Sequence, residues 1–172
     1  MIYISSLLQL FFTVTIYSFN VQTIDGSSIS LNSFRGKKML IVNTASGSKY
    51  AAQFGSLERL RQQYSDNLVI IAFPSNDFGH ESGSDSVINQ GVRSNYTIGY
   101  TLCSKVSTTG AMGSPVYQWL SDASQNGTIS STVNEDFFKY LIDENGYIRG
   151  VFAGSVDPMD SVVQNAINTN YN

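Results

Sequence analysis

Two continuous apolar runs, joined by one amphipathic segment, constrain the fold of this chain more than any other feature. The run in Lys38–Asn43 contains MLIV and the run in Leu68–Phe73 reads LVIIAF, which is typical of strands buried on both faces. Between them, Gln53–Tyr64 carries apolar residues at helical spacing, so one face of a helix is expected to point into a core. A strand, a helix and a second strand in this order predict a parallel crossover unit.

The segments on either side of this unit predict further elements. Asp25–Gly26 lies between two alternating stretches and predicts an N-terminal β-hairpin, and Glu144–Gly146 predicts the turn of a second antiparallel pair. The other expected elements are strands at Phe19–Gln22, Ser28–Leu31, Phe137–Ile142 and Tyr147–Phe152, a helix at Asp85–Ser94 that Gly91 interrupts, a helix beginning at Pro115–Leu120, and a last helix from Pro158 to about Ile167. Together they predict an α/β sandwich of three layers, in which a mixed central sheet has helices on both faces.

The composition fits one globular domain and excludes one class of partner. The chain has 172 residues, of which 42% are hydrophobic and 13% charged, so it can bury a core and does not resemble a disordered sequence. Its formal net charge is −3 and it has no basic cluster, so we do not expect it to bind nucleic acid. No internal repeat or linker divides residues 17–172, which we expect to form one domain.

Residues 1–16, MIYISSLLQLFFTVTI, form an apolar segment before this domain. They contain no Lys or Arg, whereas a signal peptide normally has a basic start and a small-residue cleavage site. They are also short for a membrane span, which needs about 20 residues. Three interpretations stay open: an atypical or truncated signal sequence, an arm packed on the fold, and a membrane anchor. Export to the periplasm or the medium is one expected location, and the cytoplasm is the other.

Five sequence blocks, in order and with near-constant spacing, resemble one known family. They are YSFNVQTIDGSSISLNSFRGKKMLIVNTAS from Tyr17, FPSNDFG from Phe73, NYTIGYTLCSKV from Asn95, SPVYQWL from Ser114 and DFFKYLIDENGYI from Asp136. Over Tyr17–Ile167 the chain resembles the glutathione peroxidases, whose active-site block reads N-x-A-S-x-(Cys or selenocysteine)-G. The resemblance implies a thioredoxin-like fold. The short connection between Leu120 and Phe137 resembles the monomeric branch of the family, which implies a monomer.

The same resemblance places substitutions at the positions where the family does its redox chemistry. The family's Cys or selenocysteine, Gln, Trp and Asn correspond to Ser48, Asp77, Glu135 and Asp136. The resolving Cys of the thioredoxin-using branch corresponds to Val92, and the Cys of F-P-C-N-Q to Ser75. Because these peroxidases work through a thiolate or selenolate that peroxide oxidises, the resemblance implies a homologue without peroxidase activity, retained as a binding or structural domain. The alternative is a residual hydroperoxide reductase of the oxidative stress response that uses glutathione or thioredoxin.

Cys103 is the only cysteine, which excludes an internal disulfide and a Cys-rich metal site. It ends the apolar stretch YTLC, which is expected to be a strand, and we interpret it as a buried structural thiol. Two alternatives stay open, a reactive thiol that replaces the missing nucleophile and an intermolecular disulfide.

The substituted positions carry three carboxylates, which prompts two hypotheses. In the first, Asp77, Glu135 and Asp136 converge into an acidic site for a cation such as Ca²⁺ or Mg²⁺, or for a polar ligand, and its alternative is that they point into water. In the second, Ser48 is a nucleophile with His80 as its base and Asp77 as the group that orients the base. The chain has no G-x-S-x-G motif to support the second, and His80 is expected in a solvent-exposed loop. No cofactor is expected, and the partner is an unidentified protein or a small polar ligand.

Overall fold

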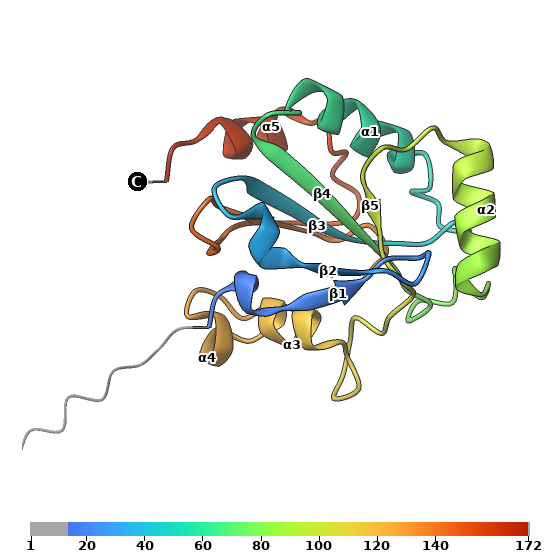
Figure 1. The fold of residues 1–172 in the computed structure, drawn as a ribbon, viewed down its shortest axis with the longest axis horizontal. Coiled ribbons are helices and arrows are strands. Elements are labelled where there is room, and N and C mark those ends of the chain that lie inside the picture. The colour runs from blue at the N-terminus through green and yellow to red at the C-terminus, as the bar shows by residue number, and fades with distance from the viewer. Residues whose placement is uncertain (1–13, 172) are drawn as a thin grey trace, which may run out of the picture.

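A five-stranded mixed sheet runs through the centre of the computed structural model, which describes residues 14–171 (Figure 1). The strands lie side by side in the order β5 (Thr101–Leu102), β4 (Leu68–Pro74), β3 (Lys38–Thr44), β6 (Lys139–Ile142) and β7 (Ile148–Phe152). β3, β4 and β5 are parallel, whereas β6 and β7 are each antiparallel to the strand before them in this order. The predicted mixed sheet and its parallel crossover are confirmed.

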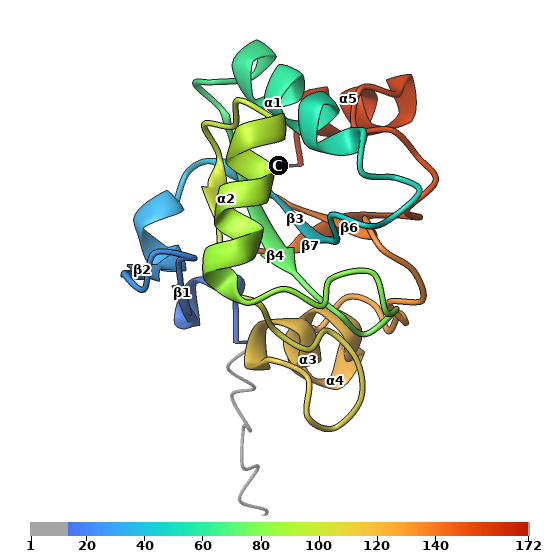
Figure 2. The same ribbon diagram turned by 90° about the vertical axis from the view of Figure 1, so that its right-hand side faces the viewer.

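Helices cover both faces of this sheet and complete the three predicted layers (Figure 2). On one face the core includes residues of α1 (Gln53–Gln63), α2 (Asp85–Asn95) and α5 (Ser161–Asn168), and on the other it includes α3 (Pro115–Ser121), which the short α4 (Ala123–Asn126) follows. Successive residues of β3 point to opposite faces, so that strand supplies both cores and its apolar run is uninterrupted. No helix within residues 14–171 combines the length and the apolar character needed to cross a membrane.

The predicted N-terminal hairpin is present, because β1 (Asn20–Gln22) pairs antiparallel with β2 (Ser28–Ser30). It lies on the α3 side of the sheet, together with the 3₁₀ turns η1 (Ile16–Ser18) and η2 (Leu31–Phe34). Ile16 is fully buried, and Trp119 Nε1 donates to the Val14 carbonyl at 2.7 Å. Residues 14–16 therefore belong to the packed fold, although the sequence assigned them to the apolar segment. The interpretations of residues 1–13 lie outside the described residues.

Two helices differ from their expected course. α2 runs through Gly91 without interruption, because Ile88 and Val92 on either side of it are buried in the same core. The last helix begins at Ser161 and not at Pro158, because the chain first makes a turn in which the Asp157 carboxylate accepts a backbone N–H at 2.8 Å.

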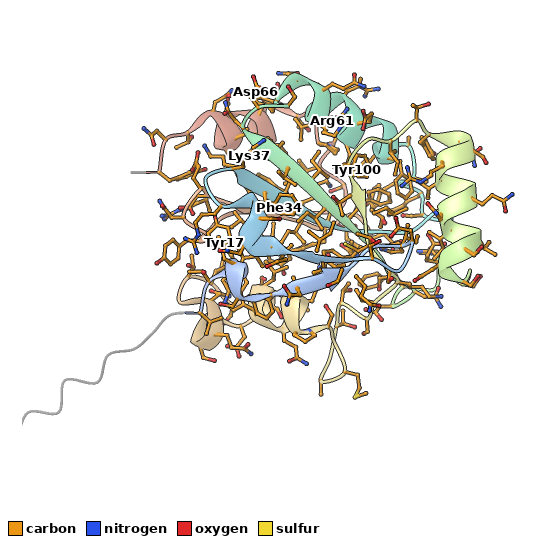
Figure 3. All side chains as sticks on the ribbon, in the orientation of Figure 1. Tyr17, Phe34, Lys37, Arg61, Asp66 and Tyr100 are labelled. Atoms are coloured by element: carbon orange, nitrogen blue, oxygen red, sulfur yellow. The ribbon has the colours of Figure 1, made fainter. Side chains whose placement is uncertain are left out.

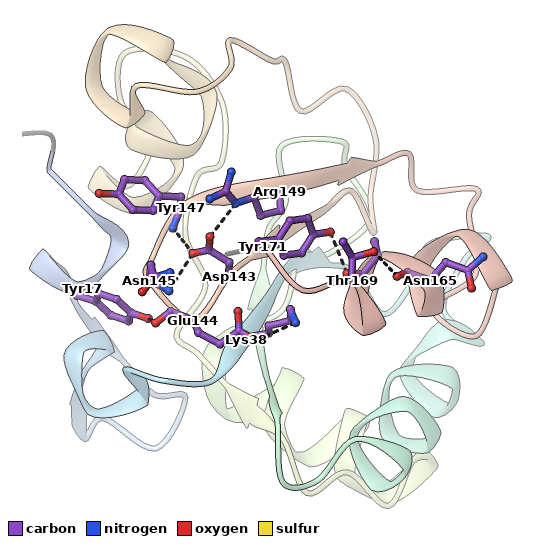
Figure 4. Close-up of polar contacts among 11 residues, drawn as sticks. Tyr17, Lys38, Asp143, Glu144, Asn145, Tyr147, Arg149, Asn165, Thr169 and Tyr171 are labelled. Atoms are coloured by element: carbon purple, nitrogen blue, oxygen red, sulfur yellow. Dashed lines mark hydrogen bonds and ion pairs between the residues drawn. The ribbon is translucent and has the colours of Figure 1, made fainter.

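The turn between β6 and β7 is organised by one buried carboxylate (Figure 4). Asp143 is fully buried and accepts the backbone N–H groups of Asn145 and Tyr147, both at 2.9 Å. Its other oxygen accepts from Arg149 Nε at 2.7 Å. Gly146 takes up a φ of +91° in the same turn. The turn predicted at residues 144–146 is confirmed.

Two buried tyrosines, Tyr17 and Tyr100, which Figure 3 labels, form hydrogen bonds between distant parts of the chain. Tyr100, next to β5, donates its hydroxyl proton to the Phe54 carbonyl at 3.2 Å, and Tyr17, in η1, donates to the Glu144 carbonyl at 2.6 Å. Both residues are 5% exposed. Each tyrosine thus combines a buried ring with a satisfied hydroxyl, as is usual for this side chain.

Candidate functional site

The candidate site is a cavity of about 330 Å³ between the turns that follow β3 and the segment that precedes β6. Ser48 lies in those turns, beyond the carboxyl end of a central parallel strand, where α/β sheets commonly place ligand sites. The residues that line the cavity are Ser48, Lys49, Tyr50, Phe78, His80, Asn134, Glu135 and Asp136. Three of the four positions selected from the sequence, Ser48, Glu135 and Asp136, are therefore brought together.

Asn43, in β3, fixes the segment that carries two of these carboxylates. Its backbone carbonyl accepts the Phe137 N–H at 2.7 Å, and its side-chain amide donates to the Glu135 carbonyl at 3.0 Å. Phe137 has a φ of 59°, a left-handed conformation that costs a residue with a side chain about 1–2 kcal/mol. This conformation delays the start of β6 to Lys139, whereas the sequence predicted a strand from Phe137.

Two donors hold Glu135 in the wall of the cavity. The Tyr50 hydroxyl donates to Oε2 at 3.0 Å, and the Gly154 N–H donates to Oε1 at 2.8 Å. A Cβ atom at Gly154 would lie 2.0 Å from the Asp136 carbonyl oxygen, so a larger residue could not approach in this way. Glu135 is therefore a bonded part of the site and does not simply point into water.

Asp136 forms a contact with His80 that the sequence did not predict. His80 Nδ1 lies 2.6 Å from Asp136 Oδ2. The His80 side chain is 50% exposed, whereas the Asp136 side chain is 3% exposed. The second carboxylate oxygen of Asp136, Oδ1, is buried and has no hydrogen-bond partner within the described residues. His80 lies in a solvent-exposed loop, as expected, and one side of its ring is in addition bound to a buried carboxylate.

The loop that carries His80 is docked against the loop that carries Ser48. The Gly47 N–H donates to the His80 carbonyl at 3.0 Å, and the Ser46 N–H donates to the Glu81 carboxylate at 2.6 Å. Ser48 Oγ accepts the Tyr50 N–H at 3.2 Å. The Ser48 hydroxyl thus keeps its own proton for donation, in a side chain that lies at the cavity wall.

Asp77 does not join the cavity. Its carboxylate accepts from Ser107 Oγ at 3.0 Å, from Thr108 Oγ1 at 2.9 Å and from the Thr109 N–H at 3.1 Å. Burial acts to raise the pKa of Asp77, but its hydrogen bonds, above all one from the Thr108 backbone N–H, hold the pKa below its usual value. Asp77 therefore organises the loop at residues 107–109, and it does not orient His80.

The three carboxylates consequently do not form the cation site that the sequence suggested. Each has its own protein partners: the Thr108 loop for Asp77, Tyr50 for Glu135 and His80 for Asp136. Across residues 14–171, no group of three or more His, Cys, Asp or Glu side chains is arranged to hold a metal ion. The cation hypothesis is wrong for this reason.

The positions that correspond to accessory cysteines, and the one real cysteine, are all buried. Val92 is 1% exposed on the core face of α2, and Ser75 is fully buried after β4. Cys103 is also fully buried, and burial raises the pKa of its thiol to about 12. It lies one residue beyond β5, where it forms an isolated bridge with Thr23 and donates its backbone N–H to the Ala72 carbonyl at 2.8 Å. The strand expected over YTLC is therefore shorter than predicted. The prediction of a buried thiol is confirmed.

Lys139 is a buried lysine next to the segment that carries Glu135 and Asp136, and its sequence position was not predicted to matter for the site. Its ammonium group donates to the Phe137 carbonyl at 2.6 Å and to the Val156 carbonyl at 2.7 Å. Burial lowers the pKa of Lys139 to about 7, although the carboxylates of Asp157 and Glu135 oppose this shift. The one available signal was a lysine inside the otherwise apolar stretch FFKYLI. Lys139 supports the strained Phe137 from behind the cavity.

Known proteins resemble this chain over most of its length. The family model described as glutathione peroxidase matches residues 16–121. A glutathione peroxidase of Lactococcus lactis subsp. cremoris is 33% identical over 144 residues, which are 83% of this chain and 91% of that protein. The glutathione peroxidase homolog BsaA of Staphylococcus aureus is 35% identical over 147 residues, 84% of this chain and 92% of that protein. The chain therefore belongs to the glutathione peroxidase family.

Solved structures give the same result for the fold. The structure described as Trgpx in apo form matches with a TM-score of 0.69 and 25% sequence identity. The match covers 91% of this chain and 97% of the Trgpx chain. A thioredoxin-family thiol:disulfide interchange protein from Chlorobium tepidum has a TM-score of 0.63 at 16% identity, over 87% of this chain and 92% of its own. The predicted thioredoxin-like fold is confirmed.

Proposed function

We propose that this member of the glutathione peroxidase family does not reduce hydroperoxides by the thiol chemistry of the family and has been retained as a binding domain. The proposal rests on Ser48. This residue stands where the resemblance places the peroxide-reducing Cys or selenocysteine, and its side chain lines the cavity. A serine oxygen has no equivalent of the reversible sulfenic state through which a thiolate turns over.

The remaining thiol gives no support to the alternative of a residual glutathione- or thioredoxin-dependent hydroperoxide reductase. Such an enzyme needs an accessible thiolate. Cys103 is fully buried, its pKa is raised to about 12, and it is not among the residues that line the cavity. Its thiol is therefore protonated at neutral pH and out of reach of a peroxide.

The polar groups of the cavity support a small polar ligand as the partner. Lys49 carries a positive charge, Asn134 an amide and Ser48 a hydroxyl, and all three line the same space. An unidentified protein is the other candidate. We propose a monomer, because the connection between Leu120 and Phe137 is short, as in the monomeric branch that it resembles. A sedimentation experiment that shows a dimer would contradict this.

The peroxidase part of the proposal is tested by steady-state reduction of hydrogen peroxide, with glutathione and then thioredoxin as the reductant. We expect no turnover by the wild-type protein. A Ser48→Cys variant should gain turnover, because it places a thiol in the cavity. Ser46→Cys is the matched control, since Ser46 is exposed, lies two positions away and does not line the cavity. Turnover by the wild-type protein at the level of the Ser48→Cys variant would overturn the proposal.

A further inference from the structure

We propose that Ser48, His80 and Asp136 form a nucleophilic site that hydrolyses small, neutral carboxylic esters. The three residues come from three separate loops and line one cavity of about 330 Å³. The inference goes beyond the proposed function, because it assigns a reaction to the cavity. It also stands apart from peroxide reduction, which is measured in a different assay.

The pairing of His80 with Asp136 supplies a base of defined orientation. When Nδ1 carries the proton that faces Asp136 Oδ2, at 2.6 Å, the lone pair of the ring lies on Nε2. The Asp136 side chain is 3% exposed, so solvent screens its charge poorly. That charge stabilises the imidazolium that forms when His80 accepts a proton.

Ser48 is placed to give up its proton in the same cavity. Its Oγ accepts the Tyr50 N–H at 3.2 Å, which leaves the hydroxyl hydrogen for a base. The bond of 3.0 Å from the Gly47 N–H to the His80 carbonyl holds the two loops together next to Ser48. The backbone N–H of Lys49 makes no hydrogen bond to the described residues, and the N–H after a nucleophile commonly contributes to an oxyanion hole. In the proposed site Ser48 is the nucleophile, His80 is its base and Asp136 orients the base. Ser48 and His80 line the same cavity but form no hydrogen bond with each other within residues 14–171, so the proton transfer requires the two side chains to approach when a substrate binds.

The proposed reaction uses these residues in two steps. Ser48 Oγ attacks the ester carbonyl carbon, its proton passes to His80 Nε2, and the carbon–oxygen bond to the alcohol breaks as His80 returns that proton to the leaving oxygen. Water then attacks the acyl-serine, giving one proton to His80, which passes it to Ser48 Oγ as the carboxylic acid leaves. The sum is one ester and one water converted into one acid and one alcohol, and no oxidant or cofactor is required.

The walls of the cavity indicate which esters fit. Glu135 and Asp136 place two carboxylates in the wall against the one ammonium group of Lys49. The excess of negative charge disfavours substrates that carry a carboxylate or phosphate of their own. Phe78 and Tyr50 add aromatic rings against which an apolar leaving group can pack. A short acyl chain on a neutral aromatic alcohol meets both conditions, and p-nitrophenyl acetate is the probe of this class.

The first experiment follows hydrolysis of p-nitrophenyl acetate by the intact chain and maps the acetyl group by mass spectrometry. We expect a burst of one acetyl group per chain, located on Ser48. The burst should vanish in Ser48→Ala and persist in Ser46→Ala, the exposed neighbour. Acetylation of Lys49 or of His80 alone, or an unchanged burst in Ser48→Ala, would overturn the proposal.

The second experiment separates the orienting role of Asp136 from a structural one. Asp136→Asn should lower kcat by at least about 100-fold with little change in KM, because the amide favours the wrong tautomer of His80. Asp77→Asn is the matched control, since Asp77 lies outside the cavity, and it should keep the wild-type kcat. If Asp136→Asn fails to fold, His80→Ala at a half-exposed position takes its place, and added imidazole should restore acylation of Ser48. Wild-type kcat in a folded Asp136→Asn variant, or no effect of His80→Ala, would contradict the proposal.

Discussion

At the residue scale, Cys103 shows how burial can make a thiol unreactive. Its pKa of about 12 leaves roughly one thiol in ten thousand ionised at pH 8, and the side chain is fully buried. We therefore expect a disulfide reagent such as dithionitrobenzoate to leave the native protein unlabelled and to titrate one thiol after unfolding in urea. Ser46→Cys supplies an exposed thiol for comparison. Native Cys103 reacting as fast as the thiol at position 46 would contradict the buried-thiol interpretation.

The same scale shows why the site was only partly predictable. Ser48, Glu135 and Asp136 could be placed together because each lies in, or within two residues of, a block whose order and spacing the family shares. The orientation of the Asp77 side chain could not be predicted, since it depends on hydrogen bonds from Thr108 in another loop. The contact between His80 and Asp136 joins residues far apart in the sequence and leaves no periodic pattern. Loop side chains take their orientation from tertiary contacts, which a single sequence does not display.

At the element scale, the turn between β6 and β7 depends on a close approach to η1. A Cβ atom at Gly146 would lie 2.7 Å from the ring of Tyr17. That ring cannot move away freely, because its hydroxyl is bonded to the Glu144 carbonyl at 2.6 Å and Arg35 lies over its face at 4.2 Å. The turn and the 3₁₀ segment are therefore packed as one unit.

Two glycine substitutions test this packing. Gly146→Ala and Gly26→Ala both force alanine into a positive φ, +91° and +87°, but a Cβ at Gly26 would meet nothing within 4 Å. Gly26→Ala should cost about 1 kcal/mol of unfolding free energy. Gly146→Ala should cost about 1–3 kcal/mol more, because it adds the clash with Tyr17. Equal losses for the two variants in urea unfolding would show that the contact with Tyr17 does not matter.

The elements themselves followed from local patterns, whereas several of their ends did not. β3 and β4 were predictable because both faces of each strand are buried, so the apolar run is unbroken. The predicted start of β6 was wrong because Phe137 has a positive φ, which the sequence does not indicate. The predicted start of α5 was wrong because a proline fits both the first turn of a helix and the turn that precedes Ser161.

At the scale of the whole molecule, buried acids limit stability at high pH. Burial raises the pKa of four tyrosines in the core and of Cys103; the tyrosines are Tyr17, Tyr100, Tyr117 and Tyr140. Above the ordinary tyrosine pKa of about 10 the unfolded chain loses protons that the folded chain keeps. Their contribution to stability is therefore complete below that pH and is lost as the pH rises. Lys139 has the opposite effect. Between about pH 7 and pH 10 the unfolded chain keeps a proton on this lysine that the folded chain has lost, so its contribution makes the free energy of unfolding rise with pH in that range.

Tyr100→Phe isolates one of these groups. The substitution removes the phenol but keeps the buried ring, and Lys139 contributes equally to both proteins. Above pH 10 the unfolding free energy of the wild type should fall more steeply than that of the variant, by up to about 1.4 kcal/mol per pH unit. Urea unfolding at several values between pH 8 and 10.5 measures the two slopes. Parallel curves would contradict the raised pKa of Tyr100.

The order of the strands has a consequence for the behaviour of the protein at high concentration. One outer strand, β5, is two residues long, and beyond it Cys103 is already paired with Thr23 of the hairpin region. The other outer strand, β7, is displaced by a register irregularity in its pairing with β6. Short and irregular edges offer few free backbone groups to a strand from another molecule, which is a common protection against aggregation. The sheet therefore ends on both sides in ways that discourage chains from joining edge to edge.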